Sequence, residues 1–309
     1  MYAAEKLIIR EAQMSFRPED IKKLRAIEDD DELLRKAAGQ ITPEILGSVI
    51  DNTVLKAYAT RLDVLRVCEE ANEIGSYVCV NGSRVKDVKD FMAQRGQSCR
   101  IRGVAAVIGF PFGAGATREK VAGALAALCD EDADEVDMVL NIGALRDSNV
   151  AVVIDDIKEV AQMVRTLSEM KGEKKILKVI QENCYLSDTE KWLAAYSIAS
   201  AAMEIGVHIF AKTSTGFGVP MQNGISVGAT LCNVYSMNKF AQGFRQKGAL
   251  IGVKAAGGVK DAAMAVKMML AGGCFDDDIV IKQNLPDIFR IGASAGKAIV
   301  DDFKERFCS

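Results

Sequence analysis

The feature that most restricts the fold of this chain is an eightfold alternation of short apolar segments with longer segments of helical spacing. The segment Thr117–Asp130 is typical of the longer kind. Its residues Val121, Leu125 and Leu128 recur at intervals of three or four, as one face of a helix requires. Strand and helix repeated in this way predict an α/β fold, the (β/α)₈ TIM barrel. The expected strands are Ser48–Leu55, Ser76–Val80, Arg102–Phe110, Glu135–Asn141, Lys175–Asn183, Val207–Ser214, Gly252–Gly258 and Arg290–Ser294.

The residues before the first expected strand are typical of a polar helical extension. Pro18, followed by two acidic residues, resembles a helix start. The acidic stretch Asp29–Glu32 fits a solvated turn or a helix terminus. Single barrels commonly reach about 250 residues, so a chain of 309 fits one barrel with an extension. We therefore expect an N-terminal helical extension over residues 1–47 and a barrel domain over residues 48–309.

The composition gives no sign of a nucleic-acid, membrane or metal partner. The net charge is −3 without a basic stripe, so nucleic-acid binding is not expected. No run approaches the ~18 apolar residues of a membrane span, and the first ten residues are charged too early for a secretory signal. The eight cysteines form no Cys-x-x-Cys pair, and with one histidine they lack zinc-site spacing. Reduced thiols in apolar segments are typical of the cytoplasm, where we expect this protein.

The single histidine, His208, limits the catalytic devices open to the chain. Ser-His-Asp, Cys-His and multi-histidine metal mechanisms would all depend on this one side chain. In an extended strand His208 would lie roughly 13 Å from Lys212, which is too far for direct proton transfer. We therefore expect His208 to be structural, with a hydrogen bond deeper in the core.

Two lysines lie in short apolar segments. Lys212 follows the run Val207–Ala211, and Lys254 lies within Ile251–Gly258. Burial disfavours an ammonium group and lowers its pKa. A lysine that acts as a nucleophile near pH 7 must be destabilised in its charged form by ~4–5 kcal/mol, and a second ammonium on the neighbouring strand would contribute. The pattern indicates imine chemistry with Lys212 as the nucleophile and Lys254 as its charged neighbour, although the reverse assignment also fits the sequence.

Charged residues inside other apolar segments indicate proton transfer or ion pairing. Asp137 lies within the fourth expected strand, where an aliphatic residue is usual. A carboxylate there can carry protons through a water molecule, and a buried structural ion pair is the alternative. Lys178, near the middle of the fifth expected strand, is expected to pair with Asp137 or with Glu182.

Glycines at the ends of the last two expected strands favour an anion site. Gly257-Gly258, with Lys260 close behind, and Gly292-Ala293-Ser294 can present backbone N–H groups to a phosphate. Phosphate sites after strands seven and eight recur in barrels. A glycine pair alone usually marks only a turn, but its combination with the Gly-x-Ser sequence favours a phosphosugar substrate.

Eight motifs occur in order between about residues 48 and 300. They are Asp51-Asn52-Thr53, Val78–Asn81, Val107–Gly113, Glu135–Leu145, Leu177–Glu182, Lys212–Phe217, Gly252–Gly258 and Arg290–Ser294. With these motifs the chain resembles the deoxyribose-phosphate aldolase family. The motifs that contain Lys212 and Asp137 are the most specific.

The resemblance implies a class I aldolase that reversibly cleaves 2-deoxy-D-ribose 5-phosphate to D-glyceraldehyde 3-phosphate and acetaldehyde. Lys212 would form the Schiff base, Lys254 would lower the pKa of Lys212, and Asp137 would relay protons through water. No metal or organic cofactor is implied, and a homodimer is plausible from the family. The residues expected to bind the substrate or its phosphate are Asp51, Thr53, Lys178, Gly216, Gly257, Gly258, Lys260, Gly292 and Ser294.

Some positions depart from the family pattern. Lys260 replaces a frequent arginine and Ala295 a frequent serine, so we expect modestly weaker phosphate binding. The segment Gly218–Thr230 is longer than usual, and its residues Val219–Asn223 are expected to reshape the mouth of the site. The tail, which ends at Ser309, lacks the terminal tyrosine of some members, which bears on proton-transfer efficiency.

Two other functions compete with the aldolase. A catalytically weak barrel that serves as a protein-binding or regulatory module would use the long loop and the extension as contact surfaces. Such a module would not need Asp137, Lys212 and Lys254 together. Another phosphosugar enzyme, such as an isomerase, would more naturally use a carboxylate base with a histidine or a metal, and the chain has one histidine.

Overall fold

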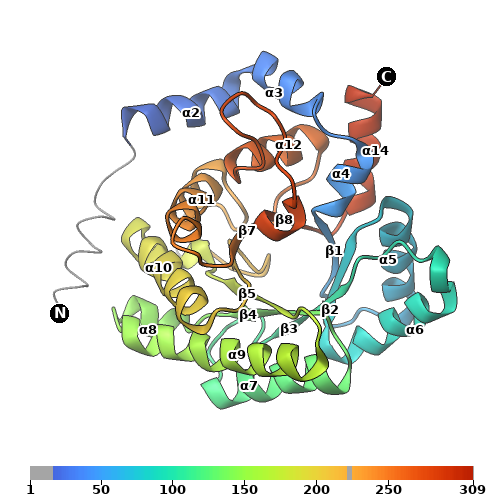
Figure 1. Cartoon of the computed structure of the whole chain (residues 1–309), viewed down its shortest axis with the longest axis vertical. Helices are drawn as coiled ribbons and strands as arrows, with labels where there is room; N and C mark the ends of the chain where they lie inside the picture. Colours follow the sequence, from blue (N-terminus) through green and yellow to red (C-terminus); the bar gives the residue numbers. More distant parts are fainter. Residues whose placement is uncertain (1–16, 221–224, 309) are drawn as a thin grey trace.

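The computed structural model describes residues 17–220 and 225–308 of the chain. Eight parallel strands close into a barrel in which each strand pairs with the next and β8 pairs with β1 (Figure 1). The α/β barrel expected from the alternation is therefore confirmed. The strands are β1 (Ile50–Val54), β2 (Tyr77–Asn81), β3 (Val104–Ile108), β4 (Glu135–Val139), β5 (Ile176–Ile180), β6 (Ile209–Lys212), β7 (Ile251–Ala256) and β8 (Phe289–Ala293).

Each observed strand overlaps its expected segment, and the differences lie at the ends. Ser48 ends a helix, and Asn183 begins a short 3₁₀ turn, although both lie in segments expected to be strands. Strand β7 stops at Ala256 because Gly257 and Gly258 turn to positive φ angles of 83° and 82°. Apolar character alone does not show where the ladder of backbone hydrogen bonds ends.

Helices surround the barrel and connect its strands (Figure 1). In the expected helical segment 117–130, residues Thr117–Leu125 are α-helical and residues Ala126–Asp130 form a π-helical turn. The elements of the outer layer are α5 (Arg61–Ile74), α6 (Val85–Arg95), α7 (Thr117–Leu125), α8 (Ile142–Arg146), α9 (Val150–Lys171), α10 (Asp188–Ile205), α11 (Leu231–Arg245), α12 (Ala262–Ala271), α13 (Leu285–Ile288) and α14 (Gly296–Phe307), with the short turns η1 (Gly82–Arg84), η2 (Gly96–Ser98), η3 (Ala126–Asp130) and η4 (Asn183–Tyr185).

Local sequence determines several helix ends. Thr60 and Asp63 form a reciprocal capping box at the start of α5, where the Asp63 N–H donates to Thr60 Oγ1 at 3.3 Å and the Thr60 N–H donates to Asp63 Oδ2 at 2.9 Å. Gly75 ends the same helix in the left-handed conformation that glycine adopts readily. Ser187 and Glu190 repeat the capping box at the start of α10.

Side-chain alternation divides each strand between two environments. In β5, Leu177 and Val179 belong to the main apolar core, which the sheet forms with the helices. Lys178 lies between them and therefore points to the other face, into the barrel. The barrel interior also holds a second, smaller apolar cluster of Leu55, Cys79, Ala105 and Val107. The barrel interior thus contains charged and apolar parts side by side.

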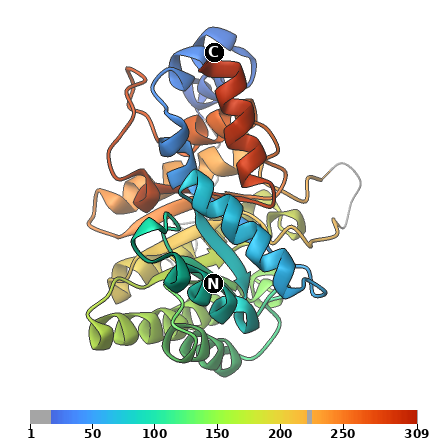
Figure 2. The ribbon, with the colours of Figure 1, turned by 90° about the vertical axis from the view of Figure 1, so that its right-hand side faces the viewer.

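The N-terminal extension forms three helices that lie on the outside of the barrel beside α11, α12 and α14 (Figures 1 and 2). They are α2 (Pro18–Asp29), α3 (Asp31–Ala38) and α4 (Pro43–Ser48). Leu34, Ala37 and Leu46 join the main apolar core. The expected helix start at Pro18 is confirmed, and the expected helix terminus falls at Asp30, whose side chain accepts hydrogen bonds from two N–H groups of α3. Residues 1–16 of the expected extension lie outside the described residues.

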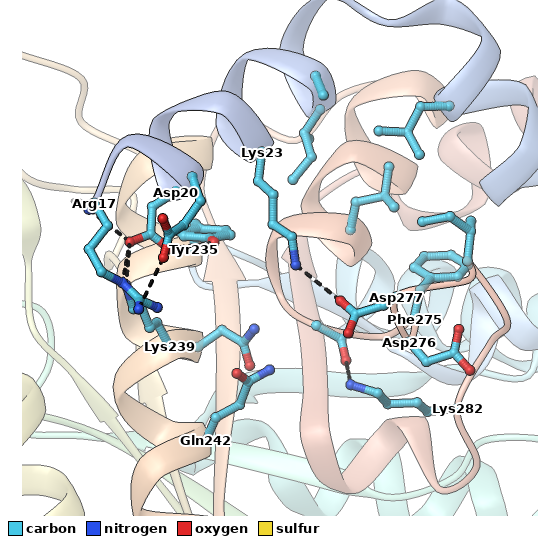
Figure 3. Close-up of a pocket in the computed structure, with 18 residues that line it drawn as sticks. Arg17, Asp20, Lys23, Tyr235, Lys239, Gln242, Phe275, Asp276, Asp277 and Lys282 are labelled. Atoms are coloured by element: carbon cyan, nitrogen blue, oxygen red, sulfur yellow. Dashed lines mark hydrogen bonds and ion pairs between the residues drawn. The ribbon is translucent and has the colours of Figure 1, made fainter.

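Polar contacts fix α2 to the barrel (Figure 3). Asp20 is 3% exposed and accepts a hydrogen bond of 2.9 Å from the Tyr235 hydroxyl and another from the Lys239 ammonium. Lys23 pairs with Asp277 at 3.0 Å. Between α2, α11 and the loop after α12 lies a cavity of about 580 Å³. Each cation in its wall contacts an acidic side chain or a backbone carbonyl, so this cavity presents no uncompensated positive charge.

Across the described ranges, no helix combines the length and the apolar character needed to cross a membrane.

Candidate active site

Lys212 and Lys254 meet at one carboxylate oxygen inside the barrel. The two lysines are register partners on the adjacent strands β6 and β7. Each ammonium donates to Asp137 Oδ2 at 2.8 Å. The nitrogens therefore lie no further apart than twice that distance, which confirms the expectation that they approach closely.

Lys178 occupies the other oxygen of the same carboxylate. It is the register partner of Asp137 across β4 and β5, and its ammonium donates to Asp137 Oδ1 at 2.9 Å. Lys178 also contacts Glu135 and, at 3.3 Å, Asp51. Of the two partners expected for Lys178, the structure selects Asp137. Glu182 does not contact Lys178 and has other partners, described below.

A second layer of charges lies beneath the first, that is, nearer the amino ends of the strands. Asp51 accepts from Lys254 at 2.5 Å and from Arg290 Nη1 at 2.9 Å. Arg290 Nη2 donates to Glu135 at 3.0 Å, and the guanidinium lies 3.4 Å from the centre of the Tyr77 ring. No role for Arg290 or Glu135 could be predicted from the sequence, because a single strand does not show which charges it will meet across the barrel.

We call these seven side chains the charge cluster. Each is at most 3% exposed, so water compensates little of their charge. The cluster holds four cations and three carboxylates, and it therefore carries one surplus positive charge when every member is ionised. Its members are Asp51, Glu135, Asp137, Lys178, Lys212, Lys254 and Arg290.

The two lysines at Asp137 differ in proton affinity. Burial lowers the pKa of Lys212, and the Lys254 ammonium lowers it further, while only Asp137 among its carboxylate contacts opposes them. Burial also disfavours the charged form of Lys254, but Asp137 and Asp51 together outweigh it and raise the pKa of Lys254. Three ammonium groups overcome the burial of Asp137 and hold the pKa of its carboxyl well below the ordinary range. Lys212 therefore loses its proton more readily than Lys254.

A clamp from the end of β5 holds the segment that follows Lys212. Glu182 adopts a left-handed backbone (φ 55°) and accepts from the Thr215 N–H at 3.2 Å and from the Thr215 hydroxyl. The Asn183 N–H donates to Thr213 O at 3.0 Å, and the Val219 N–H donates to the Tyr185 hydroxyl at 3.0 Å. These contacts fix the backbone on the carboxyl side of Lys212. The sequence contained no signal for them, because they depend on the conformation of Glu182.

An apolar wall stands beside the charge cluster. It is the smaller apolar cluster of Leu55, Cys79, Ala105 and Val107, against which Phe110 packs. The ring of Phe110 also meets Phe217 edge to face, with centroids 5.4 Å apart. Burial raises the pKa of the Cys79 thiol, which keeps this wall uncharged. A buried amine of lowered pKa, a carboxylate bonded to it and an apolar wall together suit carbonyl chemistry.

Comparison with known proteins bears on this geometry. No family model matches the chain. The deoxyribose-phosphate aldolase of Aciduliprofundum boonei is 41% identical over 257 residues, which cover 83% of this chain and 96% of the relative. The chain belongs to the deoxyribose-phosphate aldolase family. The resemblance drawn from its motifs is thereby confirmed, and the chain is an aldolase, a carbon–carbon lyase.

Two solved structures share the fold of this aldolase. One, from Coccidioides immitis, is assigned provisionally as a deoxyribose-phosphate aldolase; it is 28% identical, has a TM-score of 0.70, and each chain covers 97% of the other. The other is the deoxyribose phosphate aldolase of Aeropyrum pernix, described as a unique tetramer. It is 23% identical, with a TM-score of 0.67 and coverage of 89% of this chain and 98% of that one.

The expected phosphate residues of the aldolase lie at the carboxyl ends of β6 and β7. Gly216, Gly257 and Gly258 all have positive φ angles, and Gly258 and Lys260 are exposed. The Ala229 N–H donates to Gly257 O at 2.9 Å, so the end of the long loop packs on this turn. A Cβ added at Gly257 would be 4.0 Å from Gly216 Cα, so these two glycines lie close together. Phosphate binding by the expected residues remains a prediction.

Gly292 and Ser294 are placed differently from each other. Ser294 is exposed, beyond the end of β8 and just before α14. Gly292 lies within β8, where an added Cβ would be 3.2 Å from Lys254 Cε. The absence of a side chain at Gly292 therefore makes room for Lys254. The α14 start is held by Asn52, whose Oδ1 accepts from the Gly296 N–H at 3.1 Å.

Asp51 and Thr53 share the inward face of β1. Asp51 is fully buried with a cation on each oxygen, and Thr53 donates its hydroxyl to the Asp51 carbonyl at 2.8 Å. Asp51 therefore serves the charge cluster. The expected contacts of both residues with a substrate hydroxyl remain predictions.

Some of the positions at which the chain departs from the family pattern lie outside the described residues. Val219 and Pro220 are described, whereas Met221, Gln222 and Asn223 of the long loop, and Ser309 of the tail, are not.

His208 is held as a structural residue, but its hydrogen-bond partner is the exposed residue Asp287 of α13 and not a group deeper in the core, as was expected. Its Nε2 lies 2.9 Å from Asp287 O, and its ring stacks on Phe210 with centroids 4.9 Å apart. Burial lowers the pKa of His208 to about 4, so the ring is neutral at physiological pH.

Proposed function

We propose that this aldolase reversibly cleaves 2-deoxy-D-ribose 5-phosphate to D-glyceraldehyde 3-phosphate and acetaldehyde, through a Schiff base on Lys212. The observation that carries the proposal is the shared oxygen of Asp137, which holds Lys212 beside Lys254 in a buried cluster with one cation in excess. A deprotonated Lys212 removes that excess. The named relatives support the substrate, since they are deoxyribose-phosphate aldolases.

In the first step, the neutral amine of Lys212 attacks the C1 aldehyde of the open-chain sugar and forms a carbinolamine. Loss of water then gives an iminium ion. The departing hydroxyl needs a proton, and a water molecule next to Asp137 can deliver one. The positive iminium restores the charge that Lys212 lost, at a position where the carboxylate of Asp137 lies 2.8 Å from the amine.

In the second step, the C2–C3 bond breaks. Its electron pair moves toward the iminium and leaves an enamine, while the C3 hydroxyl loses its proton and becomes the aldehyde of glyceraldehyde 3-phosphate. Protonation of the enamine at C2 and addition of water then release acetaldehyde and free Lys212. Asp137, through water, is the proposed carrier of these protons. The two-carbon fragment fits the apolar wall beside the charge cluster.

The phosphate is proposed to bind at the turn formed by Gly216, Gly257 and Gly258, with Lys260 as the cation and Ser294 as a hydroxyl donor. Positive φ angles at the three glycines support this proposal, because they let backbone N–H groups turn toward a common point. Lys260 is a point charge and not a bidentate fork, which supports the modest affinity expected from the sequence.

We also propose that the aldolase self-associates, as a homodimer. The neighbour from Aeropyrum pernix, which is described as tetrameric, supports self-association but not a particular number of subunits. Light scattering coupled to size-exclusion chromatography gives the mass, and a monomer at micromolar concentration would refute this part.

The decisive experiment traps the Schiff base. The protein is incubated with acetaldehyde and cyanoborohydride, digested, and analysed by mass spectrometry for a reduced two-carbon adduct. An adduct on Lys212, together with release of glyceraldehyde 3-phosphate from deoxyribose 5-phosphate in a coupled assay, is expected. Lys120→Met, which removes a buried lysine outside the barrel interior, serves as the matched control and should keep both activities. Absence of adduct and of cleavage in the unmodified chain would favour the binding module.

A further inference from the structure

The charge cluster has two layers, and only the upper one touches the reacting amine. Asp137, Lys212 and Lys254 form the upper layer. Arg290 and Glu135 lie in the lower layer and contact each other at 3.0 Å. Neither contacts Lys212. They reach it through shared partners, since Arg290 holds Asp51 and Glu135 holds Lys178.

No carboxylate outside the cluster forms an ion pair with its cations in the described part of the chain, although Glu182 lies close enough to interact electrostatically with Lys212. Among the described residues, no fourth carboxylate contacts any of its cations. Glu182 bonds instead to Thr215, and burial raises the pKa of its carboxyl. Burial also raises the pKa of Cys79 and of Tyr77. The groups that surround Lys212 are thus Asp51, Cys79, Glu135, Asp137, Lys178, Glu182, Lys254 and Arg290.

We infer that Arg290 and Glu135 are positioning residues that set the proton affinity of Lys212 from the layer beneath it. The inference rests on the proposed function, because it concerns the amine that forms the Schiff base. Arg290 contributes the fourth cation and Glu135 the third carboxylate. Together they leave the excess of one positive charge that the neutral Lys212 amine removes.

The two residues act with opposite signs, although they are partners in one ion pair. Removal of the Glu135 charge leaves two excess positive charges, so the Lys212 ammonium becomes less stable. Removal of the Arg290 charge leaves none, so the ammonium becomes more stable. At a separation of about 10 Å and an effective dielectric of about 20, one buried charge moves a titration midpoint by roughly one pH unit.

The test measures the rate of acetaldehyde trapping on Lys212 between pH 5 and pH 10 in the unmodified protein and in four variants. We expect the midpoint of Glu135→Gln to fall by roughly one pH unit and that of Arg290→Met to rise by a similar amount. The double variant Glu135→Gln/Arg290→Met loses one charge of each sign and should return close to the unmodified midpoint. Arg290→Lys keeps the charge without the fork and should also stay close to it.

A purely structural role predicts a different result. Both single variants break the same ion pair, so loss of packing alone would reduce trapping in both without shifts of opposite sign. Asp156→Asn is the matched control, because it breaks a buried ion pair with Lys120 that lies outside the cluster. It should lower the melting temperature and leave the midpoint unchanged. A comparable shift in this control would overturn the inference.

The outcomes separate this inference from the proposed function. Absence of trapping in the unmodified protein refutes the Schiff base itself. Trapping with midpoints that do not move, or that move in the same direction in both single variants, refutes only the role of the lower layer. If Arg290→Met does not fold, Glu135→Gln and the double variant still decide. A downward shift in the first, reversed in the second, supports the inference, and an unchanged midpoint in the first contradicts it.

Discussion

Two buried groups of charges in this aldolase differ in their balance. Between α7 and α9, Lys120 and Asp156 form a pair at 2.6 Å, and the Thr117 hydroxyl donates to the other carboxylate oxygen at 2.9 Å. Both charged side chains are 1% exposed. Inside the barrel, the charge cluster is as deeply buried but has one cation in excess. In the cluster, burial lowers the pKa of the Lys212 amine.

The difference teaches how one residue type acquires two roles. A buried lysine with its own carboxylate, such as Lys120 with Asp156, joins two helices. Among the three lysines that share Asp137, Lys212 alone has no second carboxylate contact within the described ranges, and it alone has a lowered pKa. Burial alone therefore does not make a lysine reactive, and the local count of charges decides.

The largest effect is expected from the nucleophile itself. Lys212→Met should abolish the acetaldehyde adduct and reduce cleavage of deoxyribose 5-phosphate by roughly 10⁴-fold or more, because no other amine can replace the covalent step. The coupled assay and adduct mapping measure this loss. A variant that retains more than a hundredth of the activity would show that Lys254 or another group is the nucleophile.

The buried pair of Lys120 and Asp156 is expected to matter for stability and not for catalysis. Asp156→Asn leaves the Lys120 ammonium buried without a counter-charge and should lower the free energy of unfolding by about 3–5 kcal/mol. Thr117→Val removes only a hydrogen bond to the same carboxylate and should lower it by about 1 kcal/mol. Denaturant titrations measure both values. Equal losses in the two variants would contradict a stabilising role for the charge pair.

Removal of Lys254 tests the excess of charge directly. Lys254→Leu leaves three cations and three carboxylates, so Lys212 should keep its proton to higher pH. For an amine that must be neutral to react, a raised pKa moves the pH profile of adduct formation upward and lowers the rate near pH 7, by roughly 100-fold if the midpoint moves by about two pH units. An unchanged profile would refute Lys254 as the perturbing neighbour.

The smallest effect is expected from crowding of Lys254. Gly292→Ala places a Cβ 3.2 Å from Lys254 Cε and should slow adduct formation roughly tenfold, as moderate overpacking of about 1–2 kcal/mol would do. Acetaldehyde carries no phosphate, so this readout is independent of the phosphate role expected for Gly292. Gly243→Ala, on an open helix position, is the control and should keep the rate. If both variants react alike, the space at Gly292 is unimportant for Lys254.

Much of the fold and the upper layer of the site could be predicted from the sequence. Regular alternation identified the barrel, because its strands and helices are local patterns of period two and about three and a half. Lys212, Lys254 and Asp137 were conspicuous because charge is unusual in an apolar strand. The approach of Lys212 to Lys254 follows from the adjacency of β6 and β7, whereas Asp137 lies on β4, which neighbours neither strand, and its role comes from the family resemblance.

The lower layer could not be predicted in the same way. Arg290 and Asp51 are 239 positions apart in the chain, and their contact depends on the closure of β8 against β1. The sequence left two partners open for Lys178, because pairing with Asp137 on the neighbouring strand and pairing with Glu182, four positions further along, both fit an extended strand. The left-handed backbone of Glu182, which directs its carboxylate to Thr215, leaves no trace in the sequence pattern.

The anchoring of α2 has a consequence for the order in which the chain is made. Asp20 emerges from the ribosome early, yet its partners Tyr235 and Lys239 follow 215 and 219 positions later. Strand β1 likewise waits for β8. Helix α2 therefore spends most of translation without these partners, and it docks only when the barrel is nearly complete.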